Sequence, residues 1–222
     1  MIMSREVEFT RRTAITSGAA VMTFVFAGCS GGSDSGNDQQ DLETTFDEGR
    51  EEWKAVDLTP SDADSDPDWS TVIQTLEITH EQDGGVDDSG YITRTDTTPN
   101  SFFFDASDTY LGDKSAYVGG TLEFSLRSTH NNYQQDSAVV FEGPEGVIAT
   151  KFAKPDPDWT QFSIELDAET RSYRDSNLNG PEVDQERLEA VLSDLQALRI
   201  SGEHGSNVEE EVGLDEVQLR QA

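Results

Sequence analysis

The sequence predicts an all-β fold, a β-sandwich or barrel, with one amphipathic helix near the C-terminus. Three observations lead to this prediction: short apolar runs alternate with polar residues, turn-forming Gly, Asp, Asn and Pro separate these runs, and one stretch has helical spacing. Many short strands joined by loops are typical of sandwiches and barrels. The 11 Phe, 5 Tyr and 3 Trp supply enough large side chains for one modest core.

The expected strands lie between residues 76 and 219. The clearest alternation runs through Leu122, Phe124 and Leu126, while the continuous apolar run 138–141 is suited to a central strand. The other strands expected, in chain order, are 76–78, 91–95, 102–104, 147–152, 162–166, 198–200 and 217–219.

One stretch near the C-terminus has helical periodicity. Leu188, Val191, Leu192 and Leu195 recur at i, i+3, i+4 and i+7, and Asp184 is placed to cap the N-terminus. We expect this helix to pack across an end of the sandwich, so that its apolar stripe belongs to the core. The alternative is a docking helix for a second protein.

The chain is strongly acidic. Asp and Glu number 45 against 15 Lys and Arg, which gives a formal net charge of −30 over 222 residues and argues against nucleic-acid binding. The acids are spread along the chain, and only 4 of the basic residues are Lys. This pattern is typical of halophilic surfaces, where molar salt screens the repulsion between carboxylates. An acidic mesophilic surface is the alternative.

The N-terminal residues predict export and lipid anchoring. Arg11 and Arg12 resemble a twin-arginine export signal, and they precede an apolar run, 14–27, that is too short to span a bilayer. Phe-Ala-Gly followed by Cys29, the one cysteine of the chain, resembles a lipobox, so we expect Cys29 to carry a lipid.

Three segments follow from these signals. They are a signal peptide with lipobox at 1–28, a lipid-anchored acidic tether at 29–45, and a folded domain at 46–222. The tether is rich in Ser, Gly and Asp and has almost no apolar group to bury. The expected location is the outer face of the cell membrane.

Residues 102–127 contain Phe-Phe-Phe, then Tyr-Leu-Gly-Asp-Lys, then Tyr-Val-Gly-Gly-Thr-Leu. This stretch resembles the laminin B domain, also called laminin IV type A, although Val118 interrupts the Tyr-Gly pair of the family. The resemblance covers 46–219 and implies a jelly-roll β-sandwich of the galactose-binding-like kind, similar to carbohydrate-binding modules, in an extracellular protein. It implies no reaction. Further blocks in the order of the family are 46–49 with Trp53, 139–143, 159–166, 188–195, 198–203 and 213–217.

Calcium is the one cofactor that the resemblance suggests. Sandwich modules similar to this family often hold a structural Ca²⁺ between the opening strand and an acid of the last strand, which implies Asp47 and Asp215 here. Asp215 as a turn acid that binds backbone amides is the alternative. The alternating acids of 62–68 could also supply oxygen ligands, but in a chain with 45 acids such a run is more often a solvated halophilic surface.

Two aromatic residues are candidate ligand contacts. Asp-Pro-Asp-Trp occurs twice, at 66–69 and 156–159. Trp69 and Tyr133 are the candidates because an exposed aromatic ring can stack on the apolar face of a sugar, whereas Trp159 is expected to pack under the strand that follows it. The three histidines lack metal-ligand spacing, and the sequence contains no motif for a nucleophile or a phosphate.

We therefore expect a non-enzymatic cell-surface lipoprotein whose module binds or stabilises extracellular glycan, matrix or surface-layer material. Its partners are the membrane, through the lipid on Cys29, and that extracellular material. The alternative from another class is a polysaccharide hydrolase, which would need two carboxyl groups in a groove beside Trp69 or Tyr133. A purely structural envelope protein is the third reading.

Overall fold

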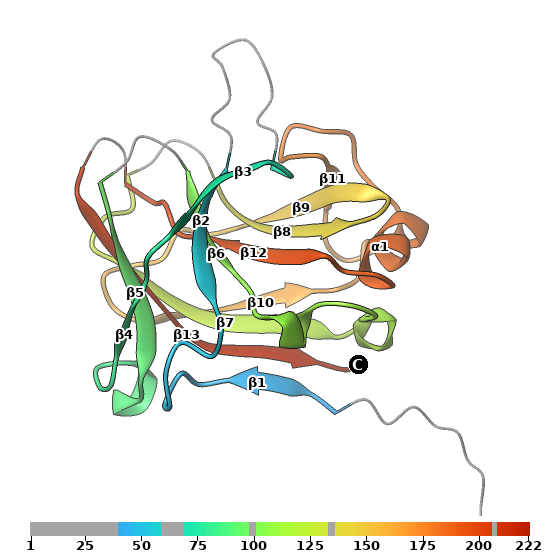
Figure 1. Cartoon of the computed structure of the whole chain (residues 1–222). Helices are drawn as coiled ribbons and strands as arrows, with labels where there is room; N and C mark the ends of the chain where they lie inside the picture. The colour runs from blue at the N-terminus through green and yellow to red at the C-terminus, as the bar shows by residue number, and fades with distance from the viewer. Residues whose placement is uncertain (1–39, 59–68, 98–100, 133–135, 206–207) are drawn as a thin grey trace, which may run out of the picture. The chain divides into compact units, whose positions relative to one another are not determined.

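A computed structural model describes residues 40–58, 69–97, 101–132, 136–205 and 208–222. Within these residues, two antiparallel β-sheets pack face to face as a sandwich, and the α-helix α1 lies beside them (Figure 1). The fold is therefore the all-β jelly-roll sandwich with one helix near the C-terminus that the sequence and its family resemblance predict.

The first sheet has six strands in the order β10-β7-β13-β5-β4, with β1 also paired to β13. Its strands are β1 (Leu42–Thr44), β4 (Thr79–Glu81), β5 (Tyr91–Asp96), β7 (Thr121–Ser128), β10 (Thr160–Glu165) and β13 (Glu210–Arg220). The pairing of β13 with β7 shifts register between Asp215 and Gln218, and Glu216 has a φ of 49° there. This irregularity interrupts the two-residue alternation, which is why the sequence predicts a strand only at 217–219.

The second sheet has seven strands in the order β11-β9-β8-β12-β6-β2-β3. Its strands are β2 (Lys54–Leu58), β3 (Val72–Leu76), β6 (Phe102–Asp105), β8 (Ser137–Gly143), β9 (Gly146–Phe152), β11 (Arg174–Asp175) and β12 (Ala197–Ser201). One face packs in the sandwich core, and the other carries a second buried apolar cluster that includes Phe103 and Val140. Burial on both faces explains why 138–141 is continuously apolar.

Aromatic side chains fill the core between the sheets. Trp53 packs edge-on against Tyr110 with ring centroids 5.4 Å apart, and Phe124 packs edge-on against Phe152 at 5.2 Å. The buried Tyr110 hydroxyl donates a hydrogen bond to the carbonyl oxygen of Val217 at 2.8 Å. The core thus gains apolar area from its tyrosines without leaving this hydroxyl unpaired.

The turn that enters β7 contains the departure from the family pattern. Val118 follows a 3-10 turn at Ser115–Tyr117 and packs against the edge of the core. Gly119 then has a φ of +83°, a left-handed conformation that favours glycine. A Cβ on Gly120 would lie 2.0 Å from the carbonyl oxygen of Arg220, so glycine is needed for β7 to approach β13. Val118 is accommodated before the two glycines, and the strand pairing after them is intact.

Helix α1 spans Gln185–Leu192 and begins where the sequence predicts. The side chain of Asp184 caps it by accepting a hydrogen bond from the backbone N–H of Arg187 at 3.0 Å. The helix packs against β8 and β9, which confirms that its apolar stripe belongs to the core. Its buried side chains are Leu188, Val191 and Leu192.

Two boundaries differ from the expectation. The helix ends at Leu192, and Leu195 instead forms a backbone bridge with Gly112, with N–H to carbonyl distances of 2.8 and 2.9 Å. Leu42–Thr44, expected as part of the tether 29–45, forms β1 by pairing with β13. The sandwich therefore begins earlier than residue 46.

Several sequence expectations lie outside the described residues. These are the export signal at Arg11 and Arg12, the lipidation site Cys29, the acidic run 62–68 and Tyr133. Among the residues that are described, no helix has the length and apolar character needed to cross a membrane.

Candidate functional site

Asp47 and Asp215 are brought to the same short segment, 84–90. Asp215, in β13, is fully buried, and its Oδ2 accepts hydrogen bonds from the backbone N–H of Val86 at 2.8 Å and from the Ser89 hydroxyl at 2.7 Å. Asp47, which follows β1, accepts a hydrogen bond from the backbone N–H of Gly90 at 3.2 Å. Asp47, just after β1, and Asp215, in β13, therefore both bond the loop at 84–90.

The negative charges of the carboxylates at this loop repel one another. Burial raises the pKa of Asp215, and the nearby Asp47 carboxylate raises it further. The pKa of Glu216 is raised by burial and by Asp215. A third hydrogen bond, from the Glu216 backbone N–H at 2.7 Å, satisfies Asp215 Oδ1. Such an arrangement fits a turn acid, and the calcium role of Asp47 and Asp215 stays a prediction.

Among the residues that the structure describes, no group of three or more His, Cys, Asp or Glu side chains is placed to hold a metal ion. Ca²⁺ takes six to eight oxygen ligands, so here it would need backbone carbonyls or water beside the two carboxylates.

Trp69 is buried, which corrects its expected role. Its ring lies in the second apolar cluster against Phe103, with centroids 5.8 Å apart, and Trp69 is only 7% exposed. A ring packed in this way offers no free face to a sugar, so the ligand contact expected of Trp69 does not fit its position. Tyr133, the second expected contact, is outside the described residues.

Trp159, by contrast, lies half-buried on the outer face of the first sheet. The guanidinium of Arg127 lies over its ring at 5.0 Å and over the ring of Tyr91 at 4.6 Å, and the two rings meet edge-on at 5.4 Å. We call Tyr91, Arg127 and Trp159 the aromatic–arginine patch. Its members come from β5, from β7 and from the residue before β10.

Hydrogen bonds and a glycine fix the aromatic–arginine patch. Arg127 donates to the Tyr91 hydroxyl at 2.7 Å, and Trp159 Nε1 donates to the carbonyl oxygen of Gly84 at 3.0 Å. A Cβ on Gly213, in β13, would lie 2.9 Å from the Trp159 ring, so the indole rests directly on the strand backbone. These contacts fix the patch, in which Arg127 and Trp159 are partly exposed and Tyr91 is buried.

A buried ion cluster lies under Trp69 on the second sheet. Arg199, with a side chain only 6% exposed, donates from Nε to Asp105 at 3.1 Å and from Nη1 to Glu142 at 2.7 Å. The same Nη1 donates to the carbonyl oxygen of Trp69 at 3.2 Å. Burial raises the pKa of Asp105, and the charge of Arg199 opposes that rise.

Polar groups are also buried where β12 ends and β13 begins. Glu210 accepts hydrogen bonds from the backbone N–H groups of His204 at 3.0 Å and Gly205 at 2.6 Å, and it also bonds the Ser128 hydroxyl. Burial raises the pKa of Glu203 to about 8 and lowers the pKa of His204 to about 3. Two side-chain atoms here, Oε2 of Glu203 and Nε2 of His204, have no hydrogen-bond partner among the described residues.

Sequence reasoning missed most of this arrangement. The spacing of Tyr91, Arg127 and Trp159 along the chain carries no signal, because three separate strands bring them together. The repeated Asp-Pro-Asp-Trp did point to Trp159, but packing was expected there and Trp69 was preferred. Glu203 and Glu210 could not be distinguished among 45 acids.

The two antiparallel sheets and the single helix α1 define a β-sandwich module. The sequence model of the family described as laminin B (domain IV) matches residues 103–222. The chain belongs to the laminin B (domain IV) family.

The chain is also similar to individual proteins. A basement membrane proteoglycan of Caenorhabditis elegans is 27% identical over 119 residues, which are 52% of this chain and 4% of that protein, so this chain spans only a small part of its relative. The L4b domain of human laminin α-2 is similar in structure, with a TM-score of 0.59 at 14% identity, over 82% of this chain and 98% of that domain. A family 11 carbohydrate-binding module of Clostridium thermocellum gives a TM-score of 0.48 at 13% identity, over 82% and 95%.

Proposed function

We propose that this chain is a non-catalytic, extracellular laminin-B-type module that binds glycan through the aromatic–arginine patch. The observation that carries the proposal is the half-buried Trp159 ring, held on a sheet face by Arg127 and Gly213. A fixed indole suits the apolar face of a sugar ring, and the flanking Arg127 and Glu211, 3.5 Å apart, can bond its hydroxyl groups. The relative named as a basement membrane proteoglycan supports an extracellular setting.

Replacement of Trp159 by Ala is expected to abolish most glycan binding. The variant loses the stacking surface, and removal of a central aromatic contact typically weakens binding roughly tenfold or more. Retention of the purified protein on neutral and acidic polysaccharides and on isolated envelope material, in molar KCl, measures this. Ile73→Ala is the matched control, because Ile73 is an exposed apolar residue of β3 on the other sheet.

Two results would contradict the proposal. If wild-type protein is retained by none of these materials, the purely structural reading takes its place. If Trp159→Ala is retained as well as wild type, the patch is only a packing device.

We further propose that Ca²⁺ binds between Asp47 and Asp215 and stabilises the loop at 84–90. The repulsion between the two carboxylates supports this proposal. A bound cation would favour the charged form of Asp215 and so offset the rise in its pKa. Calcium would have to compete with Ser89 and Val86 for the Asp215 oxygens.

Added Ca²⁺ is expected to raise the unfolding temperature relative to a chelator. Binding to the native state alone stabilises by about 2.7 kcal/mol at one hundred times Kd. Thermal unfolding in molar KCl measures the shift, and Asp215→Asn should remove it while Glu169→Gln, at an exposed acid, should not. An unchanged unfolding temperature of the wild type leaves Asp215 as a turn acid.

We also propose that Arg11 and Arg12 belong to the signal that directs export of the module, and that a lipid on Cys29 holds it at the outer face of the cell membrane. The support is the order of paired arginines, apolar run and Phe-Ala-Gly-Cys in the sequence. The excess of 45 acids over 15 basic residues would repel an anionic membrane, so anchoring would depend on the lipid.

A further inference from the structure

The charged side chains around the aromatic–arginine patch bear on the class of glycan that it can take. Arg127 supplies the positive charge of the patch, and its Nη2 lies 3.5 Å from Oε1 of Glu211. Glu211 is two residues before Gly213 in β13, so its side chain points to the face of the sheet on which Trp159 lies. The guanidinium is thus already paired with a carboxylate beside the patch.

Two further carboxylates lie near Tyr91. Glu81 is directly opposite Tyr91 in the pairing of β4 with β5, and the side chains of opposite residues share a face of the sheet. Burial raises the pKa of Tyr91, and the charge of Arg127 lowers it. The carboxylates of Glu211, Glu81 and Asp83 raise this pKa further. Three negative charges and one positive charge therefore act on the ring that packs against Trp159.

This balance of charge disfavours an anionic sugar. A uronate or sulfate group on a sugar stacked against Trp159 would be repelled by the carboxylates, and the guanidinium that could attract it is already paired. A hydroxyl group suits both kinds of neighbour, since its oxygen can accept from Arg127 and its proton can be donated to a carboxylate. The Debye length is only about 3 Å in 1 M salt, so the repulsion should act most strongly in dilute salt.

We propose that the aromatic–arginine patch prefers neutral polysaccharide to polysaccharide that carries uronate or sulfate groups, and that Glu81, Asp83 and Glu211 set this preference. The inference rests on the proposed glycan-binding function and names the class of glycan that the same site takes. The Trp159 ring offers its stacking surface to either class, whereas the carboxylates distinguish the two by charge.

Retention of the full chain on immobilised polysaccharides that share a backbone and differ in charge tests this inference. The pairs are dextran and dextran sulfate, hydroxyethyl cellulose and carboxymethyl cellulose, and methyl-esterified and de-esterified polygalacturonate. The neutral member of at least one pair should bind roughly fivefold more tightly than its anionic partner, at the lowest KCl concentration at which circular dichroism shows the native fold. This ratio should shrink in molar KCl, because the charges are then screened.

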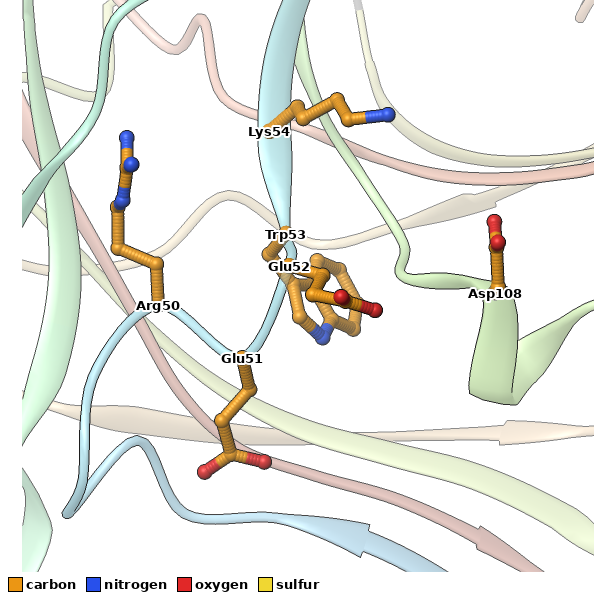
Figure 2. A pocket seen from close by; sticks show the side chains of 6 residues that line it. All are labelled: Arg50, Glu51, Glu52, Trp53, Lys54 and Asp108. Atoms are coloured by element: carbon orange, nitrogen blue, oxygen red, sulfur yellow. The ribbon is translucent and has the colours of Figure 1, made fainter.

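Two double variants separate local charge from overall charge. Glu81→Gln with Asp83→Asn should lower the ratio of neutral to anionic binding about threefold, since two exposed carboxylates near the patch are neutralised. Glu52→Gln with Glu169→Gln neutralises two exposed carboxylates elsewhere and should leave the ratio unchanged. Figure 2 shows Glu52 in a hollow beside Trp53, which is only 2% exposed, so the Trp53 ring is not available for stacking.

The outcomes distinguish failure of this inference from failure of the proposed function. Equal or tighter binding of the anionic members that is lost in Trp159→Ala overturns the preference and leaves glycan binding by the patch in place. Retention by no member of any pair also overturns the inference, and absence of retention on envelope material as well overturns the proposed function. Retention that survives Trp159→Ala overturns both. An unchanged ratio in the Glu81→Gln, Asp83→Asn variant overturns the role of the carboxylates and the inference with it.

Discussion

Replacement of Arg199 by Ala is expected to destabilise the domain by about 3–5 kcal/mol, the usual cost of removing one partner of a buried ion pair. The variant leaves Asp105 and Glu142, each with a side chain 22% exposed, without the cation that bonds them both. It also frees the Trp69 carbonyl oxygen that Arg199 bonds at 3.2 Å. Chemical denaturation at neutral pH measures the loss, which corresponds to a fall in Tm of roughly 10 °C.

Two comparison variants make this result specific. Arg220→Ala removes an exposed pair with Glu123, 3.1 Å apart, and should cost under about 1 kcal/mol. Arg199→Met combined with Asp105→Asn and Glu142→Gln removes the whole buried cluster and should recover most of the loss. An Arg199→Ala variant as stable as Arg220→Ala would show that water reaches the cluster and screens it.

The second large effect is a loss of stability as the pH rises from slightly acidic to alkaline values, caused by ionisation of Glu203. Its pKa is raised by burial from 4.5 to about 8 in the folded protein, and the carboxylates of Asp96, Glu210 and Asp57 add to the rise. Because the folded pKa is the higher one, the stabilising contribution is complete below pH 4.5 and is lost as pH rises toward 8. Glu203 by itself lowers the free energy of unfolding by about 1.4 kcal/mol for each pH unit in that window.

His204 produces the opposite dependence. Its folded pKa, lowered by burial from 6.5 to about 3, gives a contribution that is complete above pH 6.5 and is lost as pH falls. Between pH 4.5 and 6.5 the two slopes cancel, so these residues predict a plateau there and a decline on both sides.

Denaturation at several pH values measures this profile. Glu203→Gln should remove the alkaline decline and make the protein more stable than wild type at pH 8.5, whereas Glu169→Gln should follow wild type. A parallel profile for Glu203→Gln and wild type would mean that Glu203 ionises freely at this end of the sandwich.

The strand pattern was the part of the fold that could be predicted from the sequence. Alternation located β7 and β10 because each has one face in the core, and the apolar run 138–141 located β8 because both of its faces are buried. β1 could not be found, since Leu42–Thr44 has no pattern of its own and depends on β13 for pairing. β3, at Val72–Leu76 instead of 76–78, has mostly exposed residues and so also lacks the pattern.

The candidate site was less predictable because it depends on tertiary contacts. Asp47 and Asp215 were expected to meet from the order of strands in the resembled family, and segment 84–90 does bring them together. The two Asp-Pro-Asp-Trp motifs are alike in sequence, yet Trp69 is buried and Trp159 is only half-buried. The two rings differ in the sheet face that they contact. Trp69 packs on apolar side chains, whereas Trp159 lies on the backbone of a glycine.

The central position of β13 has a consequence for biosynthesis. Residues Glu210–Arg220 pair with β7, β5 and β1, so the first sheet lacks its middle strand until residue 220 has been made. A ribosome-bound chain shorter than this holds edge strands with unpaired backbone groups, which favour association with other chains. Formation of the first sheet thus depends on contacts distant in sequence, a topology that folds slowly. The edges of β5 and β7 therefore stay open to other chains until β13 has been added between them.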